Sequence, residues 1–221
     1  AGKGRLHQRV LAGEHAGRDE CRRSRASGAA QKLERFMSSS VRLPLVVPAD
    51  GAKVLVVKFN DFQCPACGQS YQAYKPIFEK YAKSNPGEVK LVLKDYPLSN
   101  KCNNNLNTEL HSGACEAAVA VRLARLKGKG DAMEDWLYTH QPEMNPDSVK
   151  KAARDIGGVT DFDEKYASTL ESVKSDLAYG KQLAVRSTPT FFINGVKVEG
   201  AMAPQFFDLA IQYELTHPRG Q

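Results

Sequence analysis

The sequence predicts a mixed α/β domain in which a series of helices separates two halves of one sheet. An apolar run at 54–59 is followed by a helical pattern and then by a second apolar run at 89–93. Strand signals are absent from 107 to 184, where helical spacing replaces them, and they return after 190. The chain has 221 residues, of which 42% are hydrophobic, so it can bury one good core and we expect one folded domain.

The first half of the predicted domain is a strand, a helix and a second strand. Residues 54–59 are β-branched and apolar, which is typical of a buried strand, and helical spacing then continues to residue 81. A Ser-Asn-Pro-Gly turn at 84–87 separates this helix from the strand at 89–93. Because a helix joins the two strands, we expect parallel pairing with a right-handed crossover. We also expect a short strand at 41–47.

Helices are predicted for the middle of the chain. Apolar residues recur there at helical spacing, and Pro146 and Thr160 stand at helix starts. The predicted helical segments are 114–125, 131–137, 146–156 and 160–177. We therefore place a helical insertion at about 107–184, between a βαβ half and a ββα half.

A hairpin and a last helix close the predicted domain. An Asn-Gly turn joins apolar runs at 191–194 and 196–199, and helical spacing covers 204–215. Thr188-Pro189 stands just before the hairpin, where tertiary context can lock a cis peptide bond.

Cys64-Pro65-Ala66-Cys67 places two thiols at the start of the first helix, where they can open and close a disulfide. Free backbone N–H groups and the helix dipole favour an anion there, so we expect Cys64 to be the exposed, attacking thiolate. Pro65 suits the first helical turn, and Cys67, one turn later, is expected to face inward as the resolving thiol. Together with Pro189 and the hairpin, this motif matches the layout of a thioredoxin-like domain.

Residues 1–40 carry most of the positive charge. They hold nine Lys or Arg against four Asp or Glu, which accounts for +5 of the chain's net +6. No interleaved aromatic residues or nucleic-acid-binding motif accompany these charges, so we expect a flexible tail or linker and no nucleic-acid partner, with 41–221 forming the domain. No apolar run approaches the roughly 20 residues that span a bilayer. The chain begins with Ala1, which fits a processed form or a segment of a longer protein.

Three segments, 59–67, 94–98 and 187–195, resemble the disulfide oxidoreductases of the DsbA type, and the resemblance covers about residues 41–215. It is closest to the thioredoxin-like domain fused to bacterial vitamin K epoxide reductase homologues, which carries an extra cysteine pair after the second strand. The resemblance implies a periplasmic or extracytoplasmic domain, either free or membrane-tethered as part of a longer protein, that donates disulfides to exported proteins. It also implies reoxidation by a quinone-linked membrane oxidase of the vitamin K epoxide reductase or DsbB type, with no cofactor beyond the redox-active disulfide.

The resemblance also assigns roles to the site residues. Cys64 forms the mixed disulfide with a substrate, and Cys67 either resolves it or completes transfer to the oxidising partner. The Pro189 loop abuts the CxxC motif, so that the backbone of Thr188 pairs with an extended substrate and Pro65 and Ala66 lie beside it.

Three further cysteines remain. Cys102 and Cys115 flank a polar loop; if they pair, the bridge contributes about 3 kcal/mol in the chain-entropy model and indicates an oxidising compartment. Cys21, in the basic segment, is interpreted as an accidental free thiol.

Lys58 and Asp61 are candidates for tuning the thiol pKa. Lys58 lies six residues before Cys64, where thioredoxins carry a buried carboxylate. Its ammonium either approaches Cys67 and favours the thiolate or extends to the surface, and we favour the surface. Asp61 is either a proton acceptor or a turn former. His111 and His140 are expected to be ordinary surface or loop residues, and Trp136 a core residue.

Other functions are open. The four cysteines at 64, 67, 102 and 115 do not have the spacing of a zinc ribbon, so no metal is expected. A reductase or isomerase of the same fold and a non-catalytic peptide-binding module remain alternatives. Because the segment 1–40 does not resemble a dimerisation region, we expect a monomer.

Overall fold

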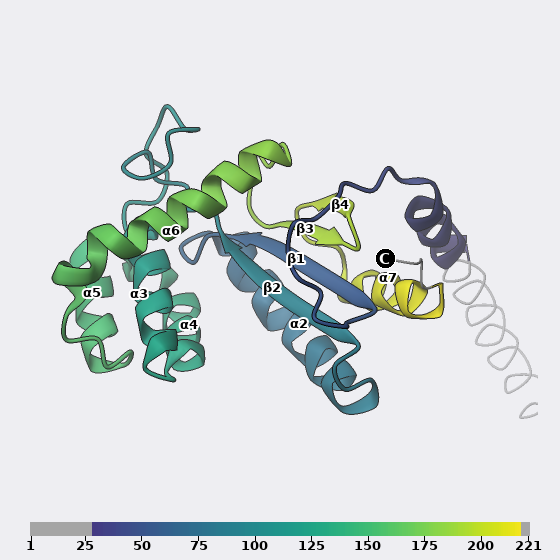
Figure 1. Cartoon of the computed structure of the whole chain (residues 1–221), viewed down its shortest axis with the longest axis horizontal. Helices are drawn as coiled ribbons and strands as arrows, with labels where there is room; N and C mark the ends of the chain where they lie inside the picture. The colour runs from purple at the N-terminus through teal and green to yellow at the C-terminus, as the bar shows by residue number, and fades with distance from the viewer. Residues whose placement is uncertain (1–27, 218–221) are drawn as a thin grey trace, which may run out of the picture.

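A four-stranded mixed sheet forms the centre of the protein, whose computed structural model describes residues 28–217. The strands are β1 (Val54–Asn60), β2 (Val89–Asp95), β3 (Thr190–Ile193) and β4 (Val196–Glu199). They lie in the order β2-β1-β3-β4 (Figure 1). β1 is parallel to β2 and antiparallel to β3, and β3 is antiparallel to β4. The predicted parallel pairing and the closing hairpin are confirmed.

Helices cover both faces of this sheet and extend beyond one end of it. α2 (Pro65–Ser84) and α7 (Pro204–Thr216) correspond to the first and last helices predicted from the sequence. Between β2 and β3 lie α3 (Ala114–Leu126), α4 (Gly130–Thr139), α5 (Pro146–Asp155) and α6 (Phe162–Gln182). Figure 1 shows α3, α4 and α5 grouped beyond the end of the sheet, with α6 running back along it toward β3 and β4. The predicted α/β fold with an inserted helical subdomain is confirmed.

The side chains of β1 alternate between two hydrophobic cores. Leu55, Val57 and Phe59 belong to the core shared with the inserted helices. Val54 and Val56 belong to the core shared with α2 and α7. Since successive strand residues point to opposite faces, Lys58 falls on the α2 side, at a position that would otherwise hold an apolar residue.

Ion pairs and hydrogen bonds connect the inserted helices α3 and α6 to the C-terminal end of β2. Asp176 of α6 accepts hydrogen bonds from the backbone N–H of Asp95 at 3.0 Å and from Lys94 at 2.8 Å. Arg122 of α3 contacts both carboxylates, donating to Asp95 at 2.6 Å. Burial raises the pKa of Asp95 to about 6, although Arg122 opposes the shift. The insertion is therefore held to the sheet by ion pairs as well as by apolar contacts.

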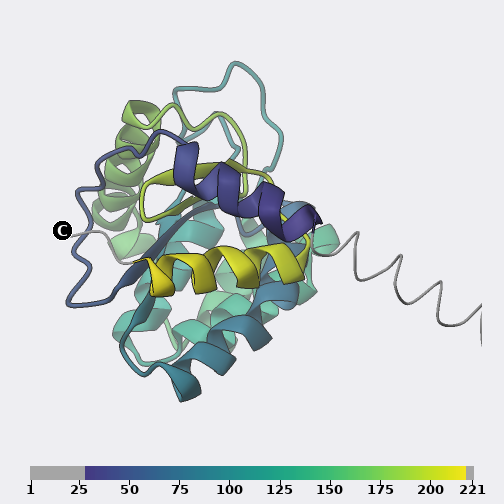
Figure 2. The same cartoon turned by 90° about the vertical axis from the view of Figure 1, so that its right-hand side faces the viewer.

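The segment before β1 differs from the sequence expectation. Residues 28–39 form a helix beside α7 (Figure 2), and Met37 is fully buried in the same core as Phe207 and Ile211. The flexible tail expected for 1–40 is therefore wrong for this part, because Met37 finds an apolar surface on α7. The strand expected at 41–47 is reduced to a single bridge between Arg42 and Val196. Residues 1–27, including Cys21, lie outside the described residues.

A buried carboxylate connects this N-terminal segment to the hairpin and α7. Glu214 is 1% exposed and accepts hydrogen bonds from both terminal nitrogens of Arg42, at 2.6 and 3.1 Å. Asn194, in the hairpin turn, donates to the same carboxylate at 2.9 Å and accepts from the N–H of Leu55 at 2.8 Å. Since a buried charge is costly unless it is paired, this cluster depends on Arg42.

Replacing Arg42 with Met should therefore lower the free energy of unfolding by about 3 kcal/mol, because the buried Glu214 side chain would lose its main partner. Urea denaturation measures the change. Arg154→Met on α5 is the matched control, since Arg154 pairs with Asp155 at the surface and its loss should be undetectable. Equal stabilities for the Arg42 variant and the native protein would contradict the role of this cluster.

Candidate active site

The two cysteines of the CxxC motif occupy the first turn of α2. Cys64 is the N-cap residue, with extended backbone angles of φ −73° and ψ 121°, and Pro65 is the first helical residue. Both cysteines are free thiols. Cys67 is fully buried, as expected. Cys64 is only 6% exposed, so the exposed thiol expected from the sequence is wrong. Pro65 and Ala66, by contrast, are exposed beside it.

The Thr188-Pro189 segment lies against this motif. Its peptide bond is cis, and the Cys64 thiol donates to the carbonyl oxygen of Thr188 at 3.4 Å. The Thr188 hydroxyl is buried and has no hydrogen-bond partner among the described residues. This hydroxyl is available to donate to Cys64 when the thiol ionises. The sequence placed Thr188 and Pro189 next to the cysteines, and the structure brings them together.

The surroundings make the two thiols unequal acids. A hydrogen bond from the Cys67 thiol is the largest cause that lowers the pKa of Cys64, from its ordinary value near 9 to about 6; burial opposes it and Thr188 reinforces it. Burial, together with the hydrogen bond to Cys64, raises the pKa of Cys67 well above its ordinary value. At neutral pH Cys64 is therefore the thiol that ionises, while Cys67 remains protonated.

Lys58 is buried directly beneath Cys67. Its side chain is covered, and its Nζ donates to the carbonyl oxygen of Cys67 at 3.3 Å and lies 5.5 Å from the centre of the Tyr138 ring. Burial lowers the pKa of Lys58, which the nearby Cys67, Glu134 and Cys64 oppose. The surface position favoured from the sequence is wrong. The alternation of β1 contained the signal, since it directs residue 58 toward α2.

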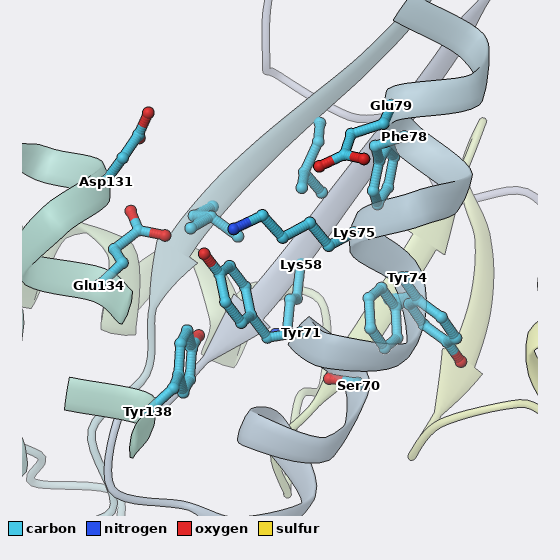
Figure 3. Close-up of a pocket in the computed structure, with 13 residues that line it drawn as sticks. Lys58, Ser70, Tyr71, Tyr74, Lys75, Phe78, Glu79, Asp131, Glu134 and Tyr138 are labelled. Atoms are coloured by element: carbon cyan, nitrogen blue, oxygen red, sulfur yellow. The ribbon is translucent and has the colours of Figure 1, made fainter. Parts of the chain in front are cut away.

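A cavity of about 280 Å³ reaches Lys58 from the side of α4. Figure 3 shows Lys58, Ser70 and Tyr71 on one side of it, with Glu134 and Tyr138 of α4 opposite. The space is large enough for several water molecules, and its lining includes polar groups that can bind them.

Asp61 joins the loop before Cys64 to the loop after β2. Its side chain is fully buried, and Oδ1 accepts from the N–H of Gln63 at 2.7 Å, as in an Asx turn. Oδ2 accepts from the N–H of Leu98 at 2.8 Å and contacts Nδ1 of His111 at 2.7 Å. His111, which we expected to be an ordinary surface or loop residue, is thus a partner of Asp61.

His140 and Trp136 lie away from these contacts. The His140 ring stacks on Trp136 at a centroid distance of 4.5 Å and its Nδ1 contacts the Trp136 carbonyl oxygen. Trp136 is partly buried against the core of the inserted helices.

A disulfide joins Cys102 and Cys115, which are 13 positions apart. It closes the loop that carries His111. No group of three or more His, Cys, Asp or Glu side chains within residues 28–217 is arranged to hold a metal ion. Across the same residues, the structure has no helix with the length and hydropathy needed to cross a bilayer.

Gln141 is a site residue that the sequence did not indicate. It follows α4, and its Nε2 donates at 2.8 Å to the carbonyl oxygens of both Phe62 and Cys64. The side chain of Gln63 also joins the loop before Cys64 to other segments: its Nε2 donates to the carbonyl oxygen of Met144, and its Oε1 accepts from the N–H of Gly113. A glutamine in an insertion loop has no local signature, so only the folded structure brings these contacts together.

The acidity of Cys64 can be measured by alkylation. In the reduced protein, the rate of Cys64 modification by iodoacetamide should rise with a midpoint near pH 6, because the thiolate is the nucleophile. Cys67 should stay unmodified through pH 8, as peptide mass spectrometry would detect. Equal modification of both cysteines, with a common midpoint near pH 9, would contradict this assignment.

The charge of Lys58 should assist departure of the Cys67 thiolate. Lys58→Met is expected to slow reduction of the Cys64–Cys67 disulfide by a small thiol several-fold at pH 7, because the leaving thiolate loses a favourable charge. Thiol release followed by fluorescence measures the rate. Lys75→Met, at an exposed lysine on the wall of the same cavity, is the control. Unchanged rates in the Lys58 variant would contradict this role.

Comparison with known proteins agrees with this geometry. A family model described as thioredoxin matches residues 44–213. The oxidised BdbD of Bacillus subtilis superposes with a TM-score of 0.56 at 22% identity, covering 76% of this chain and 90% of BdbD. The alpha-DsbA1 of Wolbachia pipientis superposes with a TM-score of 0.62 at 16% identity, covering 80% of this chain and 97% of the other. At these identities, the likeness shows a shared fold.

One curated relative is longer than this chain. The Na(+)/H(+) antiporter NhaA 3 of Salinispora tropica is 32% identical over 152 residues, which cover 67% of this chain and 21% of the antiporter. The chain thus spans about a fifth of that relative's length. The family model, in contrast, covers all four strands of the sheet and all of the inserted helices. The fold is thioredoxin-like, and the chain belongs to the thioredoxin family that this model describes.

Proposed function

We propose that this chain is a thiol–disulfide oxidoreductase that introduces disulfides into exported proteins through Cys64 and Cys67. The observation that carries the proposal is the pairing of an acidic thiol, Cys64, with a buried, protonated one, Cys67. A pKa of about 6 leaves roughly ten thiolates for each thiol at pH 7. Stabilising the thiolate stabilises the reduced protein, and this makes the disulfide a stronger oxidant.

The exchange takes place in two steps. A substrate thiolate attacks Sγ of Cys64 in the oxidised protein, a mixed disulfide forms, and Cys67 leaves as a thiolate that takes up a proton. A second substrate thiolate then attacks the substrate sulfur of the mixed disulfide and expels Cys64. The substrate gains a disulfide and the protein gains two electrons as two thiols. Cys64 is the better leaving group of the pair because its pKa is the lower.

The surface around Cys64 suits an extended substrate. Exposed Pro65 and Ala66 directly follow Cys64, and the carbonyl oxygen of Thr188 accepts from the Cys64 thiol. An extended peptide would add to the Thr188 backbone as a short strand. Main-chain pairing does not read side chains, so we propose broad specificity for reduced or unfolded exported proteins.

We propose that a quinone-linked membrane oxidase, of the vitamin K epoxide reductase or DsbB type, regenerates the disulfide at the extracytoplasmic face, in the periplasm. The Cys102–Cys115 disulfide supports an oxidising compartment. The match to about a fifth of a chain named as an antiporter supports a domain that works beside a membrane.

Two alternatives make different predictions. A reductase or isomerase of the same fold would transfer electrons in the other direction or rearrange existing disulfides. A peptide-binding module would bind unfolded chains without using the cysteines.

The test uses the oxidised protein and a reduced peptide that holds two cysteines. We expect stoichiometric formation of the peptide disulfide with two new thiols on the protein, and Cys64→Ser should abolish it. Mass spectrometry counts the products. Peptide binding without oxidation by the native protein would overturn the proposal in favour of the binding module. Reshuffling of a mispaired substrate, with no net oxidation, would favour the isomerase.

A further inference from the structure

We propose that His111 is a positioning residue for the exchange reaction. It neutralises Asp61 beside Cys64, and the Cys102–Cys115 disulfide holds it there. The proposal concerns the site of the proposed oxidoreductase and rests on that function. Its evidence is a set of contacts that join the disulfide-closed loop to Asp61 and Gln63, two of the three residues before Cys64.

The Asp61 carboxylate is close enough to Cys64 to oppose its ionisation. The backbone N–H of Cys64 donates to the carbonyl oxygen of Asp61 at 3.2 Å, so the two residues form one turn. The Asp61 side chain is fully buried, where water screens its charge poorly. Its negative charge raises the pKa of Cys64. A positive charge paired with this carboxylate would therefore favour the Cys64 thiolate.

His111 supplies that charge. Its Nδ1 lies 2.7 Å from Asp61 Oδ2, and its ring is 20% exposed. The backbone N–H of His111 donates to the carbonyl oxygen of Leu98 at 3.0 Å, while the N–H of Leu98 donates to the same Asp61 oxygen. Hydrogen bonding to Asp61 is the main cause that raises the pKa of His111, so the ring keeps its charge at pH values where Cys64 ionises.

The disulfide fixes the loop that presents this ring. Cys102 and Cys115 close the segment that contains His111 and Gly113. The N–H of Gly113 donates to Oε1 of Gln63 at 2.9 Å. One covalently closed loop therefore contacts both Asp61 and Gln63, directly before the nucleophile.

Other charges face the same groups and must stay constant in the test. Those facing Cys64 are Cys67, Asp61 and Lys58, and those facing His111 are Asp61, Cys64 and Glu109. The appropriate variant therefore removes the charge of His111 while keeping a hydrogen-bond donor. Glutamine does this.

In His111→Gln, the midpoint of the Cys64 thiolate titration should move up by about 0.5 to 1 pH unit. The alkylation rate at pH 6 should then fall about two- to five-fold, and the rates should converge above pH 8.5. His111→Lys should restore the native midpoint, because a lysine supplies the charge again. His217→Gln is the control, since the His217 ring hydrogen-bonds with Tyr213 and Thr216 of α7 and stacks on Tyr213, and contacts neither Asp61 nor Cys64.

Coupling tests the route through Asp61. In an Asp61→Asn background, His111→Gln should have less than half of its effect, because no carboxylate remains to be neutralised. A protein with both Cys102→Ala and Cys115→Ala should show a midpoint displaced in the same direction as His111→Gln. A native midpoint in this double variant would overturn the role of the disulfide.

A native Cys64 midpoint in a folded but less stable His111→Gln protein would overturn the proposal and leave His111 as a stabilising residue. A displaced midpoint that His111→Lys fails to reverse would overturn the charge argument. These titrations need no substrate. If the native protein fails to oxidise a peptide while the midpoint still moves, the proposed function fails and the inference about His111 stands.

Discussion

The burial of the Cys67 thiol directly behind Cys64 is the constraint on which the reactivity of this site depends. Burial keeps Cys67 protonated, and the protonated thiol donates to the sulfur of Cys64. The acidity of one thiol is thus produced by the suppressed acidity of the other. The fold creates this inequality through the first turn of α2, which places one sulfur at its end and the other one turn inside. Thr188, just before β3, is the other neighbour of the Cys64 sulfur, because its carbonyl oxygen accepts from the thiol.

Buried charges surround this pair of sulfurs on two sides. Lys58 lies beneath Cys67 and forms no ion pair among the described residues, so burial destabilises its charged form. Asp61 lies beside Cys64 and is paired with His111. A positive charge on Lys58 lowers the pKa of Cys67, so it opposes the burial that keeps this thiol protonated and assists its departure as a thiolate. A neutralised carboxylate near Cys64, the thiol that must ionise, avoids repulsion.

Much of the fold followed from local sequence pattern, because β1, α2 and the closing hairpin each carry strong periodicity or turn signals. The adjacency of Pro189 to the cysteines followed from a resemblance in motif order. Three features required the folded chain. The 28–39 helix depends on a surface that α7 offers to Met37. The burial of Lys58 opposes the usual tendency of a strand lysine to extend outward, and the alternation of β1 is the only local signal for it. His111 and Gln141 reach the site from loops whose positions no local pattern specifies.

The redox equilibrium of the Cys64–Cys67 pair with glutathione tests the central claim most directly, because direction of transfer depends on potential. The acidic Cys64 and the charge of Lys58 predict an oxidising couple, with a potential above about −200 mV. The Pro-Ala dipeptide between the cysteines lacks the histidine of the strongest DsbA-type oxidant, so a value below about −120 mV is expected. A potential near −270 mV, about that of thioredoxin, would contradict the account and identify a reductase.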